Sequence, residues 1–504
     1  MSTARKILSN TVAQLIGKFA VAILGLVVVK VSTGYLSVEG YGEYILIYEF
    51  LAFFGIAADL GLFTIAVREM SQDESKIPKI IGNILSLRTI LVVLTMAIAV
   101  ATIFLIPKYA DSRIPIGVTI ASITVFLTIL NGTITSVLQA KLQMQQASLT
   151  TVLGKIISVA FMLYVVFWGF KTDTENGFYM LIFAGNLGNF IMLLSTHHYV
   201  RKITPLEYRF DLDFWKEVLV KSLPYGIALI LNTIYFRIDS ILISYIRGQE
   251  EVGIYGVAMK MLESFAIIPL YFMNSVLPVL TKALKDKSER YKEIISYAFD
   301  FLTSLSIPMV VGGFILAYPI IFVISTPDFL SRLSEGFYGS DIAFQILIFA
   351  LLFQFLNVLF AFILISINKQ SKLLYINGSC VLFNLITNFI FIPYYGFRGA
   401  AFTSVLSELF ILIITYLVAR RYLDFHINLK NLGKIIFSSM VMGAVIYLLQ
   451  PLTYEYIQNW NVLVLVPCGM MVYGLLLVKT GVIDKKMLAL LRKGEGKSHD
   501  GNMV

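Results

Sequence analysis

The chain has 504 residues, of which 58% are hydrophobic and 14% are charged, and its mean hydropathy is +0.81. Soluble domains carry about 25% charged residues, so this composition excludes an ordinary water-soluble fold. The net charge of +9 comes from lysines and arginines in short segments between apolar runs, which is typical of membrane topology and not of a nucleic-acid-binding surface. No nucleic-acid partner is therefore expected.

Apolar runs recur along the whole chain at a length that matches a lipid bilayer. A hydrocarbon core of about 30 Å requires about 20 apolar residues per helix. This rule predicts an all-α polytopic membrane protein with about fourteen transmembrane helices. The predicted spans are Thr11–Leu36, Tyr41–Val67, Ile81–Pro107, Ile114–Ala140, Ser148–Phe170, Gly177–Val200, Leu223–Ile246, Val252–Leu280, Ile294–Ile324, Ala343–Ile367, Leu373–Ile392, Gly399–Ala419, Ile435–Leu452 and Asn461–Leu477.

Lysines and arginines between the predicted spans fall mainly on one side of the membrane. The side that carries both termini holds 28 of the 40 lysines and arginines, whereas the opposite loops hold 6. Short cytoplasmic segments are rich in Lys and Arg, so this bias predicts the orientation. We expect a multi-pass protein of the cytoplasmic (inner) membrane with both termini in the cytoplasm.

A weak internal repeat accompanies a long basic segment in the middle of the chain. Tyr41-Gly42-Glu43-Tyr44 opens the second span and Val252-Gly253-Ile254-Tyr255 opens the eighth, at an offset of 211 residues. Repeated lobes around a midplane site are typical of transporters. The central segment interleaves Phe214 and Trp215 with charges, as an amphipathic surface helix does.

These features predict two six-helix lobes followed by two extra C-terminal helices. The predicted divisions are an N-lobe with helices 1–6 (1–200), a cytoplasmic amphipathic linker (201–222), a C-lobe with helices 7–12 (223–421), helices 13–14 (422–480) and a basic cytoplasmic tail (481–504).

Charged residues inside spans are functional candidates, because each costs about 2.5–3.5 kcal/mol at the bilayer centre on insertion scales. The predicted spans contain six cations and six acids. The cations are Lys18, Lys30, Arg88, Lys155, Arg237 and Lys260, and the acids are Glu49, Asp59, Asp239, Glu263, Asp300 and Glu408.

The seventh span offers the sharpest candidate for substrate binding. Its residues Thr233, Arg237, Ser240 and Ser244 share one helix face, while Asp239 points elsewhere. Arg237 is therefore expected to line a cavity. The other candidate substrate-binding residues are Lys260, Arg88 and Lys155. The alternative is that these cations form neutralised pairs that hold helices together, as Lys260 could with Glu263, three residues along the same helix.

The intramembrane acids are candidates for coupling transport to a proton or sodium gradient. Glu49 and Asp59 in the second span are the foremost, with solvation or ion pairing as the alternative. The further candidates are Asp239, Glu263 and Glu408. In the eleventh span, Asn377, Asn384 and Asn388 share a face, which favours hydrogen bonds between helices over substrate contact.

Several expected signs of an enzyme are missing. Gly496-Lys497-Ser498 resembles the end of a phosphate-binding loop, but Leu491 replaces its first glycine. None of the four histidines has metal-ligand spacing. Neither of the two cysteines suggests a thiolate metal site. We therefore predict no catalytic residues, no metal and no cofactor, with energy coming from an ion gradient or from the substrate's own gradient.

Four groups of residues, in this order, resemble one known family over nearly the whole chain. The groups are Ala58-Asp59-Leu60-Gly61-Leu62 with Arg68-Glu69, Leu223-Pro224-Tyr225-Gly226 with Arg237-Ile238-Asp239, Val252-Gly253-Ile254-Tyr255, and Asn388-Phe389-Ile390-Phe391-Ile392-Pro393 with Gly396, Gly399, Ala400 and Ala401. The family that they resemble is the polysaccharide transporter branch of the multidrug/oligosaccharidyl-lipid/polysaccharide exporter superfamily, the Wzx-type flippases.

The resemblance implies two lobes around a central cationic cavity that moves a polyprenyl-diphosphate-linked oligosaccharide to the outer leaflet by alternating access, for surface polysaccharide synthesis. It implies membrane lipids and a polysaccharide polymerase or other synthesis proteins as partners. Lipid II flippases are an alternative, although the first span here has Lys18 and Lys30 in place of their adjacent arginine–aspartate pattern. Multidrug exporters of the same superfamily and a non-transporting scaffold of a polymer-synthesis complex are the further alternatives.

Overall fold

A computed structural model of the chain describes residues 3–427 and 429–482, with side chains described from Gln14 onward. The predicted basic tail from residue 483 and the Gly496-Lys497-Ser498 stretch lie outside these residues. Within them the regular structure is helical, apart from one isolated bridge between Arg332 and Phe337.

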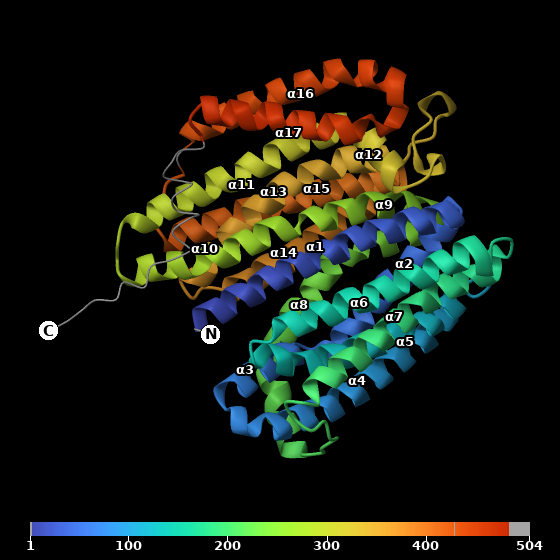
Figure 1. Cartoon of the computed structure of the whole chain (residues 1–504), viewed down its shortest axis with the longest axis vertical. Coiled ribbons are helices and arrows are strands. Elements are labelled where there is room, and N and C mark those ends of the chain that lie inside the picture. Colours follow the sequence, from blue (N-terminus) through green and yellow to red (C-terminus); the bar gives the residue numbers. More distant parts are fainter. Residues whose placement is uncertain (1–2, 428, 483–504) are drawn as a thin grey trace. The chain divides into compact units, whose positions relative to one another are not determined.

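Seventeen α-helices make up most of the described chain (Figure 1). They are α1 (Thr3–Tyr35), α2 (Val38–Asp59), α3 (Leu62–Gln72), α4 (Ile77–Leu105), α5 (Ile114–Ala140), α6 (Met144–Tyr164), α7 (Thr174–Val200), α8 (Leu212–Ile246), α9 (Gln249–Phe265), α10 (Ile267–Lys285), α11 (Arg290–Ile315), α12 (Ala317–Ile324), α13 (Ser340–Ser366), α14 (Ser371–Tyr395), α15 (Phe397–Tyr422), α16 (Lys430–Ile457) and α17 (Val462–Lys479). Short 3-10 turns at Glu74–Lys76, Pro327–Phe329, Leu333–Glu335 and Gln458–Asn461, and a π-turn at Val165–Gly169, adjoin them.

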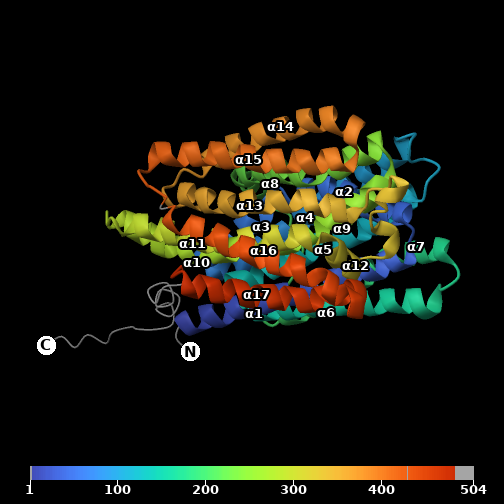
Figure 2. The ribbon, with the colours of Figure 1, turned by 90° about the horizontal axis from the view of Figure 1, so that it is seen from above.

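Thirteen segments of the described chain are long and apolar enough to cross a membrane. The last of them, Lys430–Lys479, contains both α16 and α17, which Figures 1 and 2 show side by side and joined by a turn. That segment therefore accounts for two crossings, which gives fourteen. The predicted polytopic all-helical architecture is confirmed.

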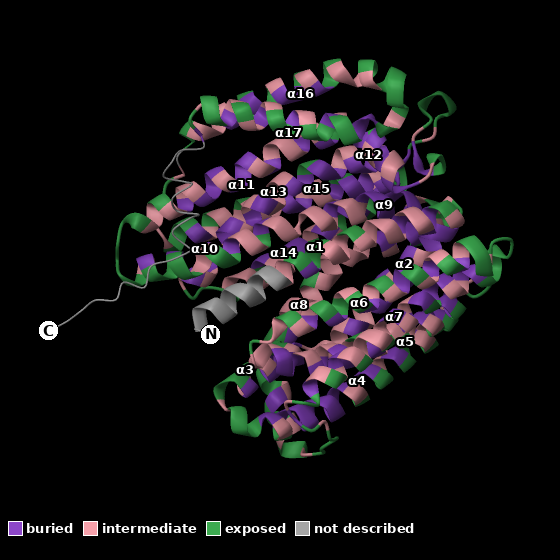
Figure 3. Cartoon of the chain, viewed as in Figure 1, coloured by how far each residue is buried: buried purple, intermediate pink, exposed green. Residues whose placement is uncertain are grey.

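Large apolar side chains are exposed along many helices, as expected where lipid covers them. The α16–α17 hairpin is a clear case, and Figure 3 shows exposed residues along both of its helices. Its exposed side chains include Phe437, Tyr447, Leu448 and Met470.

Two compact units divide the described residues. Unit 1 comprises the chain up to Lys260 together with Ile324–Phe329 and Asn377–Thr403, and unit 2 comprises the remainder. The division into six-helix lobes therefore stays a prediction. Part of the predicted amphipathic linker belongs to α8, which runs without interruption from Leu212 through Pro224.

In unit 1 the linker side chains Phe214 and Trp215 pack against an apolar cluster built from α3, α4 and α5. One side of Phe214 and of Trp215 is therefore covered by protein. The first turns of α8 are thereby fixed to the helices that precede them in the chain.

Glycines bring α2 close to its neighbours at both of its ends. A Cβ atom at Gly42 would lie 1.8 Å from the Gln249 carbonyl oxygen, and one at Gly253 would lie 2.2 Å from the Val38 carbonyl oxygen. The two glycines related by the 211-residue repeat therefore allow α2 and α9 to touch through their backbones.

At the other end of α2, Gly61 has a φ of +74°, which ends the helix and starts α3. A Cβ atom there would lie 2.7 Å from the Tyr225 Cβ of α8. Because α2 is held against α9 at one end and α8 at the other, the side chains between these contacts have fixed positions.

Unit 2 is held by apolar packing and by a few buried hydrogen bonds. Residues of α16 and α17, including Ile435, Met442 and Leu465, form an apolar cluster with Leu316. The Tyr473 hydroxyl donates to the Ser304 carbonyl oxygen at 2.7 Å, which links α17 to α11.

Candidate substrate cavity of unit 1

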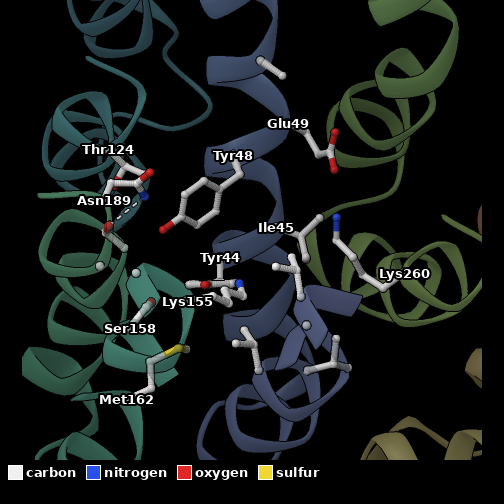
Figure 4. Close-up of a pocket in the computed structure, with 18 of the residues that line it drawn as sticks. Tyr44, Ile45, Tyr48, Glu49, Thr124, Lys155, Ser158, Met162, Asn189 and Lys260 are labelled. Carbon is white, nitrogen blue, oxygen red and sulfur yellow. Dashed lines mark hydrogen bonds between the residues drawn. The ribbon is translucent and has the colours of Figure 1, made fainter. Parts of the chain in front are cut away.

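A cavity of about 530 Å³ lies inside unit 1 (Figure 4). Seven helices contribute to its wall: α1, α2, α5, α6, α7, α8 and α9. Its volume is within the range of pockets that hold small ligands, about 300–1,000 Å³. The α1 side is apolar and is formed by Val21, Val28 and Val29.

Four charged side chains line this cavity: Lys155, Arg237, Lys260 and Glu49. With both lysines and the arginine protonated and the glutamate ionised, they give the wall a net charge of +2. Desolvation strengthens the attraction of such a wall for an anion. The structure therefore brings together three of the four predicted substrate-binding residues and one of the predicted coupling acids.

Arg237 and Glu49 form an ion pair that joins α8 to α2. The Arg237 Nη1 atom lies 2.7 Å from Glu49 Oε1 and 3.0 Å from Oε2. The Arg237 side chain is 30% exposed and that of Glu49 is 8% exposed. Arg237 thus lines the cavity and also joins two helices, which combines the two roles considered from the sequence.

Glu49 and Lys260 occupy equivalent positions of the internal repeat. They are separated by 211 residues, as are Gly42 and Gly253, and lie seven residues beyond those glycines on α2 and α9. Figure 4 shows their head groups directed toward the same part of the cavity. The repeat has therefore placed opposite charges at matched positions.

Lys155 reaches the cavity from α6 and is half-buried. Among the described side chains it forms no ion pair. Because the wall contains a single carboxylate for three cations, it carries an excess of positive charge, to which Lys155 contributes and which an anionic ligand can neutralise.

Arg88 is not among the residues that line this cavity. It lies on α4, and its Nη2 atom donates to Asp59 at the end of α2. The Arg88 side chain is only 3% exposed. Its Nε and Nη1 atoms have no hydrogen-bond partner among the described residues.

Asp239 is buried in a polar network that joins α8, α9 and α14. The Tyr255 hydroxyl donates to its Oδ2 at 3.0 Å, and the Asn388 Nδ2 donates to its Oδ1 at 2.7 Å. Asn388 also donates to Asn384 at 3.0 Å. The prediction that this asparagine stripe makes hydrogen bonds between helices is confirmed for Asn388, and Asp239 is not among the residues that line the cavity.

The remaining coupling candidates also lie outside the cavity wall. Glu408 is buried in unit 2, where the Asn357 Nδ2 donates to its carboxylate. Glu263 lies near the end of α9, and its predicted pairing with Lys260 stays a prediction. Asp300 on α11 accepts a hydrogen bond of 2.7 Å from Asn431.

The predicted polar stripe of α8 contributes only Arg237 to the cavity. Ser244 is fully buried, and its hydroxyl lies 2.9 Å from the Tyr109 hydroxyl. Lys108 donates to the carbonyl oxygens of Ser244 and Tyr245 at 2.8 and 2.6 Å, at the end of α8. Burial lowers the pKa of the Lys108 ammonium. The loop after α4 therefore fixes the end of α8, and Ser244 of the predicted stripe takes part in this contact and not in the cavity wall.

Uncharged polar residues of the wall were missed by the sequence reasoning. They include Tyr44, Tyr48, Thr124, Ser158 and Asn189, from α2, α5, α6 and α7. The spacing of Tyr41, Tyr44, Tyr48 and Glu49 on one face of α2 was a usable signal.

No group of three or more His, Cys, Asp and Glu side chains in the described part of the chain could hold a metal ion. Lys30, a further predicted intramembrane cation, donates to the Ser325 carbonyl oxygen at 2.5 Å.

Comparison with known proteins supports the same fold and lineage. The family described as "Polysaccharide biosynthesis protein" matches residues 7–284, and the MatE family matches residues 224–390. An uncharacterised membrane protein of Methanocaldococcus jannaschii is 27% identical over 276 residues, which cover 52% of this chain and 51% of that protein. The chain thus spans about half the length of this curated relative.

Three solved structures share the fold at 16% sequence identity. The lipid II flippase MurJ in an inward closed conformation has a TM-score of 0.73, with 95% of this chain and 100% of that chain covered. An inward-facing multidrug resistance transporter of the MATE family has a TM-score of 0.65, with 82% and 98% covered. A MOP superfamily transporter from Pyrococcus furiosus has a TM-score of 0.60, with 83% and 95% covered.

Proposed function

Because the chain belongs to the polysaccharide biosynthesis protein family of the multidrug/oligosaccharidyl-lipid/polysaccharide exporter superfamily, we propose that it flips a polyprenyl-diphosphate-linked oligosaccharide. The substrate would move from the cytoplasmic to the outer leaflet by alternating access, for surface polysaccharide synthesis. A polysaccharide polymerase or another synthesis protein would then use the flipped product.

The cationic cavity of unit 1 carries this proposal. A diphosphate diester bears one negative charge on each phosphate, which matches the net charge of +2 contributed by Lys155, Arg237, Lys260 and Glu49. Arginine offers a planar fork to phosphate oxygens, and each hydrogen bond to a charged group contributes about 1.5–3 kcal/mol. A cationic drug would be repelled by the same wall.

Lipid II is the second candidate substrate, favoured by the similarity of this fold to the solved lipid II flippase. Lipid II also carries a diphosphate, so the charge of the cavity suits both candidates. The head-group sugars distinguish them, and a transport assay must therefore compare the two.

Coupling to a proton or sodium gradient is assigned to Glu49 in this proposal. Protonation of Glu49, or a bound cation, would weaken its pairing with Arg237 and release the guanidinium for the diphosphate. Asp59 is a weaker candidate, because it pairs with Arg88, which is buried and does not line the cavity.

Proteoliposomes test the proposed transport. The purified full chain is reconstituted with a fluorescent polyprenyl-diphosphate oligosaccharide, and a membrane-impermeant quencher reports the fraction in the outer leaflet. We expect faster equilibration with protein than in protein-free liposomes, and slower equilibration with Lys155→Ala/Lys260→Ala. Equal rates with and without protein would refute the flippase, and preferential transport of lipid II would favour the second candidate.

The cytoplasmic location of both termini belongs to the same proposal. Reporters fused after Gly481 should behave as cytoplasmic, and reporters inserted near Gly336 should behave as external. The opposite pattern at both sites would invert the direction of transport.

A further inference from the structure

The cavity of unit 1 has a second chemical character beside its charged groups. Tyr44 and Tyr48 on α2, Thr124 on α5 and Asn189 on α7 contribute uncharged polar and aromatic surface. Figure 4 shows Tyr48 between Glu49 on one side and Thr124 and Asn189 on the other. The charged and the uncharged surfaces are therefore neighbours within one cavity.

The two tyrosines form an aromatic wall. The ring centroids of Tyr44 and Tyr48 lie 5.2 Å apart, with 66° between the ring planes. Tyr41 stacks on Tyr44 from the preceding turn, at 6.2 Å and 20°. Packing of this kind fixes the rings, and each tyrosine offers an apolar ring with a polar hydroxyl. A pyranose suits such a wall, because its ring faces carry C–H groups and its rim carries hydroxyls.

Asn189 provides hydrogen-bonding groups at the edge of this wall. It accepts from the Thr128 hydroxyl at 2.9 Å and donates to the Gly185 carbonyl oxygen at 2.9 Å. An asparagine side chain has two N–H groups and two acceptor lone pairs. Since these two bonds use one of each, a donor and an acceptor are left for a ligand while the side chain stays oriented.

Gly185 on α7 allows the Thr124 and Tyr48 hydroxyls to lie close to the same point of its backbone. A Cβ atom at Gly185 would lie 3.1 Å from the Thr124 Oγ1 and 3.2 Å from the Tyr48 hydroxyl. Gly154 and Gly188 also line the cavity, and they allow α6 and α7 to pack closely, because a Cβ atom at Gly154 would lie 2.7 Å from the Gly188 carbonyl oxygen. Gly25 on α1, by contrast, has open space where a Cβ atom would be. The Thr124 and Tyr48 hydroxyls are therefore close enough to each other to contact one ligand in the cavity.

We infer that Tyr44, Tyr48, Thr124 and Asn189 form a subsite for the sugar attached directly to the diphosphate. This inference rests on the proposed function, in which the neighbouring cations hold the diphosphate itself. The covalent link to the diphosphate places that sugar beside the cations. The subsite selects substrates by the hydroxyl pattern of their first sugar.

Two lipids distinguish binding at this sugar subsite from binding at the diphosphate site. One is a polyprenyl diphosphate with a single hexose, and the other is the same polyprenyl diphosphate without sugar. Binding of each to the detergent-solubilised full chain is measured for the native protein, Tyr48→Ala, Tyr48→Phe and Asn189→Ala. Tyr447→Ala is the matched control, because Tyr447 is an exposed residue of α16 in unit 2.

We expect Tyr48→Ala to weaken binding of the sugar-bearing lipid about tenfold and Asn189→Ala to weaken it about fivefold. Each ratio follows from contacts of about 1–1.4 kcal/mol. Binding of the sugar-free lipid should stay within twofold of the native protein, and Tyr447→Ala should change neither. Tyr48→Phe keeps the ring and should lose less than Tyr48→Ala, so it serves if the alanine variant fails to fold.

An equal loss for both lipids, or no loss for either, would overturn the sugar subsite while leaving the diphosphate site intact. If the native protein binds the two lipids equally, the subsite is also refuted. If it binds neither lipid, the proposed function fails together with the subsite.

Discussion

Two arginine–carboxylate pairs of unit 1 join α2 to a neighbouring helix, yet they differ in their surroundings. Arg88 and Asp59 have side chains that are 3% and 17% exposed. Arg237 and Glu49 have side chains that are 30% and 8% exposed, and they border the cavity. A charged side chain inside a membrane span is therefore expected to have a partner of opposite charge. Whether it also binds a ligand depends on whether the pair borders a cavity and on which other charges line that cavity.

The difference follows from the balance of charge around each pair. Arg88 pairs with Asp59, and its Nε and Nη1 atoms have no partners among the described residues. Because the side chain is buried outside the cavity, a ligand in the cavity does not reach these atoms. Around Glu49, by contrast, Lys155 and Lys260 add positive charge to that of Arg237. An anion that enters the cavity can therefore compete with Glu49 for Arg237, whereas no such exchange is open to Arg88.

The largest expected effect is the loss of stability in Arg88→Ala. Removing one partner of a buried ion pair leaves an uncompensated charge and costs about 3–5 kcal/mol. Thermal unfolding of the detergent-solubilised protein should show this as a large fall in Tm and in folded yield. The double variant Arg88→Met/Asp59→Leu should recover much of the stability, because it removes both charges. A normal Tm with impaired substrate binding would place Arg88 in the substrate site.

Arg237→Ala should affect binding more than stability. Loss of hydrogen bonds worth about 1.5–3 kcal/mol should weaken binding of the lipid-linked saccharide by roughly one to two decades. Arg237→Lys should recover only part, since a lysine lacks the bidentate fork. Normal affinity in a well-folded Arg237→Ala protein would remove the diphosphate role. A fall in Tm that is rescued by also removing Glu49 would make the pair structural.

Glu49→Gln should have the smallest effect on affinity and a distinct effect on coupling. A partly exposed ion pair contributes about 0.2–1 kcal/mol, so freeing Arg237 should strengthen binding of polyprenyl diphosphate by up to about fivefold. Transport should lose its dependence on a proton or sodium gradient. The double variant Arg88→Met/Asp59→Leu, which leaves no unpaired charge at the other pair, is the matched control and should keep that dependence. Unchanged gradient dependence in Glu49→Gln would place coupling at another residue.

The sequence predicted the helices well, because apolar length and the placement of charge are local properties. It predicted α5 at Ile114–Ala140, as observed, and the interhelical role of Asn388. It did not predict that Ser244 would contact Tyr109 and so help to fix the end of α8, because Tyr109 belongs to a loop 135 residues away in the chain.

Local sequence patterns also could not predict which residues pair with the intramembrane charges. Arg237 and Glu49 are 188 residues apart in the chain. The 211-residue repeat, however, relates Glu49 to Lys260 as it relates Gly42 to Gly253. Extending that alignment by two turns would have pointed to both charges from the sequence alone.

Photo-cross-linking tests most directly whether the cavity of unit 1 holds the diphosphate end of the substrate. A polyprenyl diphosphate with a photoreactive group next to the diphosphate is bound to the native full chain, irradiated and mapped by mass spectrometry. We predict labels on the cavity-lining stretches of α2, α6 and α8, and their loss when inorganic pyrophosphate is added in excess. Labels confined to unit 2 or to α4 around Arg88, or labels on the cavity that pyrophosphate leaves unchanged, would contradict this account.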